Sequence, residues 1–276
     1  MTTSLTAKVK LNNGVEMPWF GLGVWQVKDG EEAKDSVKAA LKAGYIGVDT
    51  AAAYKNEKSV GEAIRESGVN RDDLFITSKV WNGDQGYEST LAAFDATMQK
   101  LGLDVLDLYL IHWPVKGKYK DTWRAMEKLY KDGRIRSIGV SNFQPHHLDD
   151  LLEDAEVVPA VNQVEFHPLL TQSELIDYCA KKGIQVEAWS PLAQGRLFDN
   201  EALTSLADKY GKSPAQIQLR WVLDKGVVVL TRSVKESRVI ENADIFDFTL
   251  TPEEISSLEA LNKNERTGPD PDNFNF

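Results

Sequence analysis

Two hydrophobic patterns alternate along the chain. Short apolar or β-branched runs, of the length of a strand, are each followed by a longer segment whose apolar residues recur at spacings of three and four. This alternation is typical of repeated βα units that feed a parallel sheet. The runs predict eight strands, at Phe20–Val24, Ile46–Asp49, Leu74–Lys79, Val105–His112, Ile135–Val140, Ala160–Glu165, Gln185–Trp189 and Val227–Leu230.

The segments between these strands predict helices, several of which end at glycine, the residue that most readily adopts the left-handed conformation of a helix stop. Two helical segments, Asn200–Tyr210 and Pro214–Lys225, fall between the seventh and eighth strands, so one of them is an insertion beyond the basic repeat. The other predicted helices are Glu31–Ala43, Glu57–Glu66, Glu88–Leu101, Tyr119–Lys131 and Leu175–Lys182, and the glycines at helix ends are Gly44, Gly68, Gly102, Gly133 and Gly183.

The number of strands favours a closed α/β architecture, a (β/α)8 or TIM barrel, over a doubly wound open sheet, which has about five or six strands. A length of 276 residues fits one such domain, spanning 1–276. Ahead of the first barrel strand, Lys8–Leu11 and Glu16–Pro18 flank an Asn-Asn-Gly turn and predict a β-hairpin across the barrel bottom. The tail 264–276, rich in Pro, Asp and Asn, is expected to form a loop over the active-site face.

Composition narrows the range of partners. The chain carries 32 Lys and Arg against 42 Asp and Glu, a net charge of −10, which opposes binding to nucleic acid or to an anionic membrane. A single cysteine, Cys179, allows no intramolecular disulfide and no Cys-based metal cluster, so no metal is expected. Residues 1–10 lack the apolar core of a targeting signal, and no run of about 18 apolar residues occurs. We expect a monomeric cytoplasmic protein that acts on a small molecule.

Candidate reactive groups follow the predicted strands. In a (β/α)8 barrel the carboxyl ends of the strands form one shared concave face, which places Asp49, Tyr54, Lys79 and His112 at the same mouth. Each has a structural alternative: Tyr54 as a packing residue, Asp49 and Lys79 as an ion pair closing the barrel top, and His112 as a core histidine. Convergence of all four on one mouth favours chemistry.

The four groups together suit reduction of a carbonyl. A carbonyl that accepts hydride develops negative charge on its oxygen, so the site must supply a proton and stabilise an oxyanion. Tyr54 can donate that proton if the ammonium of Lys79, held by Asp49, lowers the phenol pKa from about 10. His112 would orient the carbonyl oxygen by hydrogen bonding.

Three segments, Val48–Tyr54, Ile76–Lys79 and Leu110–Pro114, resemble the catalytic segments of the aldo-keto reductases. Gly139–Phe143, Asn162–Pro168 and Ala188–Leu192 are similar to segments that bind the nicotinamide in that family. The resemblance implies that Ser141, Asn142 and Gln163 hold the carboxamide, and that Trp189 stacks on the ring beside Ser190 and Leu192. Within the family, the short chain most resembles bacterial 2,5-diketo-D-gluconate reductases and glyoxal or methylglyoxal reductases.

The resemblance also implies an NADPH site after the eighth strand. The chain has no Rossmann fingerprint, because Gln26 stands where the third glycine after Gly21 and Gly23 would fall. Arginine forks and a hydroxyl suit a 2′-phosphate, and the segment from Arg232 onward offers Arg232, Ser233, Arg238, Glu241 and Asn242. The alternative is a basic helix start at the surface. The family usually has Pro-Lys-Ser where this chain has Thr231-Arg232-Ser233, so some use of NADH stays open.

Small aldehydes, ketones and α-dicarbonyls such as methylglyoxal are the expected substrates, with Trp25, Trp81, Trp113 and Phe274 as candidates for the pocket wall or, equally, for core packing. Two other functions remain open. A lysine at a strand end also suits a Schiff-base aldolase, in which Lys79 would be the nucleophile, although its pairing with Asp49 favours the unreactive ammonium. A non-catalytic barrel that senses the cofactor is the third alternative.

Overall fold

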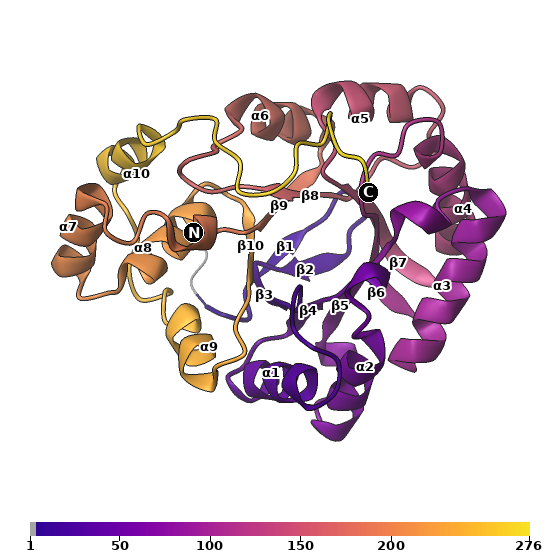
Figure 1. Ribbon diagram of the computed structural model, residues 1–276, viewed down its shortest axis with the longest axis horizontal. Helices are drawn as coiled ribbons and strands as arrows, with labels where there is room; N and C mark the ends of the chain where they lie inside the picture. The colour runs from indigo at the N-terminus through magenta and orange to yellow at the C-terminus, as the bar shows by residue number, and fades with distance from the viewer. Residues whose placement is uncertain (1–3) are drawn as a thin grey trace.

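The computed structural model describes residues 4–276, so the first three residues of the segment expected to lack a targeting signal lie outside the described part. Eight parallel strands form one closed barrel in the order β10-β3-β4-β5-β6-β7-β8-β9, as the sequence predicts. Helices surround this barrel on all sides in Figure 1. The barrel strands are β3 (Phe20–Gly23), β4 (Gly47–Asp49), β5 (Phe75–Val80), β6 (Leu106–Ile111), β7 (Ile135–Ser141), β8 (Val161–Glu165), β9 (Gln185–Trp189) and β10 (Val228–Thr231).

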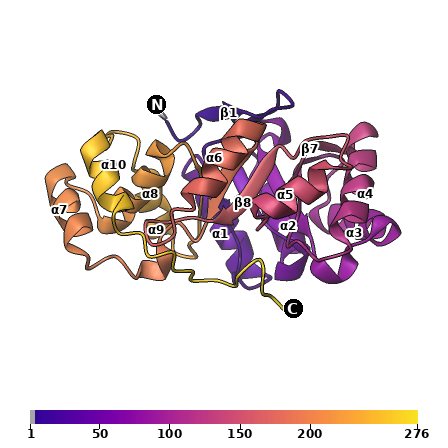
Figure 2. The ribbon, with the colours of Figure 1, turned by 90° about the horizontal axis from the view of Figure 1, so that it is seen from above.

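The predicted hairpin is also present and closes the amino-terminal end of the barrel. It pairs β1 (Lys8–Lys10) with β2 (Glu16–Pro18), and the amide of Asn12 donates a hydrogen bond to the Pro159 carbonyl oxygen just ahead of β8. Its apolar side chains Leu11 and Met17 pack with residues from several barrel strands in a second, smaller core. Figure 2 shows the hairpin and the carboxyl terminus on opposite edges of the molecule.

The helices agree with prediction wherever the amphipathic segment is long. Each of the five glycines expected at a helix end has a positive φ. Two helices, α7 and α8, lie between β9 and β10, which confirms the inserted helix. The longer helices are α1 (Glu31–Lys42), α2 (Glu57–Glu66), α3 (Tyr87–Leu101), α4 (Tyr119–Lys131), α6 (Ser173–Lys182), α7 (Glu201–Tyr210) and α8 (Pro214–Asp224).

Three helices of eight residues lie outside the predicted helical segments: α5 (Pro145–Leu152), α9 (Glu236–Ala243) and α10 (Pro252–Glu259). For α9, the sequence predicts a helix start only as the alternative to a phosphate site. Two of them carry start signals, because α5 and α10 each have proline in the first turn and a reciprocal capping box. In α10 the box joins Thr251 and Glu254, a signature visible in the sequence.

The carboxyl-terminal tail crosses the opposite end of the barrel from the hairpin, as expected. After α10 the chain passes the loop that follows β8, where the amides of Lys263 and Glu265 donate to the Leu169 carbonyl oxygen. Figure 1 shows this yellow segment running from α10 past α6 and α5 and ending near the middle of the view. Within residues 4–276, no helix has both the length and the apolar character needed to cross a membrane.

Candidate active site at the carboxyl ends of the strands

The four strand-end residues of the sequence prediction lie together at the barrel mouth. Lys79 is fully buried, and its Nζ lies 2.5 Å from Asp49 Oδ1. The same ammonium donates to the Thr50 carbonyl oxygen at 3.0 Å and to the Tyr54 hydroxyl at 3.4 Å. The rings of Tyr54 and His112 make an edge contact with centroids 5.6 Å apart. Three partners around Lys79 Nζ therefore match the three donors of an ammonium group.

Burial and neighbouring charge set the protonation states at this mouth. Burial acts to lower the pKa of Lys79, but Asp49 and Tyr54 outweigh it, so the pKa of Lys79 is raised and the amine stays charged. Burial lowers the pKa of His112 well below its usual value, and the Lys79 charge acts in the same direction. His112 is therefore neutral near pH 7. Its Nδ1 is sealed from solvent and has no hydrogen-bond partner among the described residues.

The structure modifies the expected effect of Lys79 on Tyr54. Burial raises the pKa of the Tyr54 phenol, and the Lys79 charge offsets this only in part, so the net direction is upward rather than downward. The hydroxyl is consequently protonated at neutral pH. Lys79 still acts on Tyr54 in the predicted direction, because its charge favours the phenolate that remains when the proton leaves.

The residues expected around a nicotinamide are also brought together. Ser141 Oγ donates to the Gln163 carbonyl oxygen at 2.8 Å, and Trp189 Nε1 donates to Asn142 Oδ1 at 2.8 Å. Asn142 has a φ of 65°, a left-handed conformation that asparagine tolerates, and its amide donates to the His112 carbonyl oxygen at 3.0 Å. The loop after β7 is thus tied to the loop after β6. Ser190 and Leu192 follow β9 at the same end of the barrel.

The residues expected at a 2′-phosphate lie between β10 and α9. Arg232 Nη2 donates to the Gln26 carbonyl oxygen at 3.1 Å, and Ser233 Oγ accepts the Lys235 amide proton at 3.0 Å. Arg238 is exposed in the first turn of α9, and within residues 4–276 its guanidinium forms no ion pair. The amides of Arg238 and Val239 donate to the Lys235 carbonyl oxygen, whereas those of Glu236 and Ser237 have no acceptor among the described residues. This terminus therefore carries an unneutralised cation beside two free amides.

Two more residues expected at the cofactor lie further along α9, with different surroundings. Asn242 is buried, whereas Glu241 is exposed and accepts a hydrogen bond from Ser213 Oγ at 2.7 Å. Glu241 therefore also ties α9 to the start of α8.

Aromatic side chains cover the mouth from one side. Trp81 contacts the His112 ring at 5.2 Å between centroids and stacks on Phe276 at 5.9 Å. Trp113 contacts Phe274 and Phe276, each at 5.2 Å. Trp25 is 51% exposed in the loop after β3 and makes no ring contact among the described residues. Two of the three predicted pocket tryptophans therefore join the tail in one aromatic wall.

The tail is held over the mouth by contacts that sequence reasoning missed. Glu165, at the end of β8, accepts hydrogen bonds from the backbone amide and hydroxyl of Thr267. Burial acts to raise the pKa of this carboxyl group, but the hydrogen bonds from His167 and Thr267 outweigh it, so the pKa is lowered. Gly268 fits only because it lacks a side chain: an added Cβ would lie 2.5 Å from the Trp189 ring. Asn82 donates to the Phe276 carbonyl oxygen at 2.9 Å. The signal available in the sequence was an acidic residue at the end of the predicted strand Ala160–Glu165.

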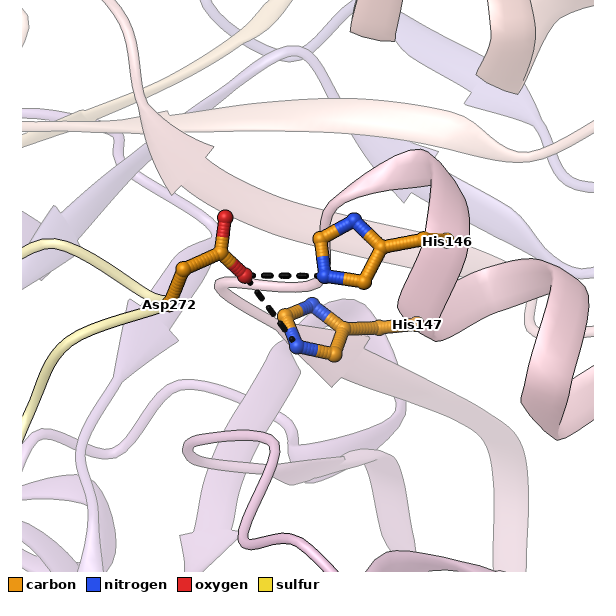
Figure 3. A group of neighbouring side chains, drawn as sticks. All are labelled: His146, His147 and Asp272. Atoms are coloured by element: carbon orange, nitrogen blue, oxygen red, sulfur yellow. Dashed lines mark ion pairs between the residues drawn. The ribbon is translucent and has the colours of Figure 1, made fainter.

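A third anchor of the tail is a cluster of His146, His147 and Asp272, drawn in Figure 3. Asp272 Oδ1 lies 2.8 Å from His146 Nε2 and 3.4 Å from His147 Nε2. His147 Nδ1 accepts the Gln144 amide proton at 3.1 Å, which places the imidazole proton on Nε2, facing the carboxylate. That tautomer donates a hydrogen bond to Asp272 instead of offering a lone pair to a metal ion.

Comparison with known proteins agrees with this geometry. The model of the aldo/keto reductase family matches residues 20–263. Glyoxal reductase of Bacillus subtilis is 67% identical over the full length of both chains, and methylglyoxal reductase DkgA of Escherichia coli is 48% identical over 96% of this chain and 97% of its own. A solved structure of a Gox0644 mutant in complex with NADPH is 41% identical, with a TM-score of 0.93 over 98% of this chain and 99% of that one. The family match, the barrel and the strand-end residues lead to one conclusion: the chain belongs to the aldo/keto reductase family of oxidoreductases.

Proposed function

We propose that this protein reduces small aldehydes, ketones and α-dicarbonyls, methylglyoxal and glyoxal among them, to alcohols with NADPH, and that Tyr54 is the general acid. The observation that carries the proposal is the contact chain from Asp49 through Lys79 to the Tyr54 hydroxyl, with the neutral His112 ring against the phenol. The relatives named glyoxal and methylglyoxal reductase support this substrate class.

The residues present fit an extended NADPH across the mouth. At the nicotinamide end, Gln163 Oε1 accepts no hydrogen bond from a described residue and is free to meet the carboxamide. At the phosphate end, the unpaired Arg238 and the amides at the start of α9 suit a dianion. NADPH bound there would supply the hydride.

The chain's own groups would then complete the reduction. The carbonyl oxygen lies within reach of the Tyr54 hydroxyl and His112 Nε2, which together hold it while negative charge develops. Tyr54 gives its proton to that oxygen, and the ammonium of Lys79 stabilises the phenolate left behind. The aromatic wall of Trp81, Trp113 and Phe276 excludes water from this region.

The same geometry disfavours the aldolase alternative. A Schiff-base nucleophile must be a neutral amine, whereas the Lys79 ammonium is buried, occupied by three acceptors and held charged by Asp49. Borohydride with a ketone substrate should consequently leave no stable adduct on Lys79.

The decisive experiment compares the unmodified protein with Tyr54→Phe. NADPH oxidation with methylglyoxal and a panel of aldehydes should be rapid in the unmodified protein, and Tyr54→Phe should lower turnover about 10²–10⁴-fold with cofactor affinity retained. Near-normal turnover in Tyr54→Phe under saturating NADPH would show that Tyr54 is not the general acid. Failure of the unmodified protein to oxidise NADPH with any carbonyl would overturn the proposed reaction.

We further propose that the whole chain acts as a single-domain monomer in the cytoplasm, with no nucleic acid or membrane partner. The net charge of −10 and the single, buried Cys179 support this. Light scattering coupled to gel filtration should give a mass near 30.8 kDa.

A further inference from the structure

Glu187 is a buried carboxyl group at the active site that the proposed reaction does not use. It lies on β9, it is 1% exposed, and its register partner on β8 is Gln163. Consecutive side chains of a strand point to opposite faces, so partners in register share a face. Here that shared face is the barrel interior, because the Gln163 side chain reaches Asp49 on β4.

Gln163 links this carboxyl group to the pair of Asp49 and Lys79. Its Nε2 donates to Glu187 Oε2 at 2.7 Å and to Asp49 Oδ2 at 2.9 Å. An amide nitrogen has two protons, and both are used here, so the amide can offer only Oε1 to any further group. The reverse orientation would place the amide oxygen against the Asp49 carboxylate, which is unfavourable in a buried site.

We propose that Glu187 is a positioning residue for the cofactor: with Asp49 it fixes the amide of Gln163 so that Oε1 faces the nicotinamide carboxamide. This inference rests on the proposed use of NADPH. The carboxamide would donate a proton to Oε1, which sets the rotation of the ring and thus the direction in which hydride leaves. Without an acceptor at position 187, the amide keeps only Asp49 as a restraint.

The ionisation of Glu187 sets an upper pH limit on turnover. The charged and titratable groups that face it are Asp49, Lys79 and Tyr54. Burial, followed by repulsion from Asp49, raises the pKa of Glu187 to about 8, so near neutrality it is mostly the uncharged acid. Its ionisation at higher pH adds a negative charge that raises the pKa of Tyr54 and makes the phenol a weaker acid.

Two substitutions separate the positioning of Gln163 from the effect of Glu187 ionisation on Tyr54. Glu187→Gln keeps an acceptor oxygen for Gln163 but cannot ionise, whereas Glu187→Leu removes the acceptor at similar volume. Glu127→Gln is the matched control: Glu127 is a buried carboxylate on α4 that accepts the amides of Glu156 and Val157, away from the mouth. Binding of NADPH and of NADH is measured by quenching of tryptophan fluorescence, and turnover is measured from pH 6 to pH 10.

Glu187→Leu should raise the dissociation constants of NADPH and NADH by the same factor, about 3- to 10-fold, because the nicotinamide end is common to both and one hydrogen bond is lost. Glu187→Gln should bind both within twofold of the unmodified protein at pH 7. The unmodified protein and Glu127→Gln should lose turnover above about pH 8, whereas Glu187→Gln should keep it.

Unchanged cofactor affinity in Glu187→Leu, or a loss for NADPH alone, would overturn the positioning role. If Glu187→Leu does not fold, as judged by circular dichroism, Glu187→Met, which also lacks an acceptor oxygen, replaces it in the binding measurement with the same expected and overturning results. An alkaline limb in Glu187→Gln identical to that of the unmodified protein overturns the pH limit. Binding is read without turnover, so a protein that binds NADPH but reduces no carbonyl would refute the proposed reaction and leave this inference standing.

Discussion

Lys79 interacts with two active-site groups: it neutralises Asp49, and its charge favours the Tyr54 phenolate. Lys79→Met should therefore lower turnover at pH 7 by at least about tenfold, the effect of losing one charge-assisted contact of roughly 1.5–3 kcal/mol. It should also raise the Tyr54 pKa further, which a spectrophotometric titration of the phenol against Tyr54→Phe would detect. An unchanged pH–rate profile in Lys79→Met would refute the coupling between the two side chains.

Asp49→Asn should act in the same sense more weakly, because two effects of Asp49 oppose each other. It holds Lys79 in place, but its own charge raises the pKa of Tyr54. Lys79→Met leaves Asp49 buried without its cation, which costs about 3–5 kcal/mol of folding free energy. Thermal melts of both variants therefore accompany the kinetics, with turnover compared only where the protein is folded.

His112 links the active site to the stability of the fold. Its pKa is lowered in the folded state by burial and by Lys79, so below the unfolded value of about 6.5 the unfolded chain binds more protons than the native one. The resulting stability is fully present above that pH and is lost as pH falls, by up to about 1.4 kcal/mol per pH unit. Urea unfolding at pH 7.5 and pH 5 should show a smaller difference in His112→Asn than in the unmodified protein. Equal differences would mean that His112 is protonated as readily in the fold as in the unfolded chain.

The first turn of α9 is the element that we expect to decide the choice between NADPH and NADH. If Arg238 contacts the 2′-phosphate, Arg238→Ala should raise the dissociation constant of NADPH at least about tenfold and leave that of NADH within a few-fold. Arg232→Ala should show a smaller effect, because its guanidinium already donates to the Gln26 carbonyl oxygen. Arg124→Ala, which removes an exposed cation paired with Asp121 on α4, is the control for net charge. Equal losses for NADPH and NADH in Arg238→Ala would place the phosphate elsewhere.

Local patterns account for most of the elements but not for the shortest ones. The barrel strands were predicted to within one residue at each end, because β-branched and apolar runs bounded by turns have one natural interpretation in a parallel sheet. The helices that the periodicity did not predict, α5, α9 and α10, are eight residues long and offer barely two turns of periodicity. In α5 the capping side chain is Gln144 rather than the serine, threonine or aspartate that usually marks a helix start.

The candidate site likewise contains residues that the sequence could place and residues that it could not. Asp49, Lys79 and His112 could be placed from the sequence because the carboxyl ends of barrel strands meet whatever the loops do. Glu187 could not be placed, because its relevance depends on the β8–β9 register and on the Gln163 side chain reaching Asp49 in the barrel interior. The path of the tail depends equally on distant partners, Glu165 on β8 and Asn82 after β5.

The barrel is closed at its two ends by two terminal segments, the hairpin at the amino-terminal ends of the strands and the tail at their carboxyl-terminal ends. Only the tail covers reactive groups, and its last aromatic residues complete a wall begun by Trp81 and Trp113. Removal of that wall should affect the substrate more than the cofactor, since the tail rings contact tryptophans beside His112 and not the segment around Arg238.

The double substitution Phe274→Ala with Phe276→Ala tests whether the tail affects substrate binding more than cofactor binding. It should raise KM for aromatic and branched aldehydes by about tenfold, the loss of roughly 1–2 kcal/mol of aromatic contact. KM for methylglyoxal, which is too small to span the wall, should change less, and the dissociation constant of NADPH should stay within twofold. Val105→Ala, which trims an exposed apolar side chain just ahead of β6 at the hairpin end, is the control and should leave all three constants unchanged. A parallel rise in KM for every aldehyde, large and small, would mean that the tail orders the mouth as a whole, while a weakened NADPH complex would place the tail against the cofactor.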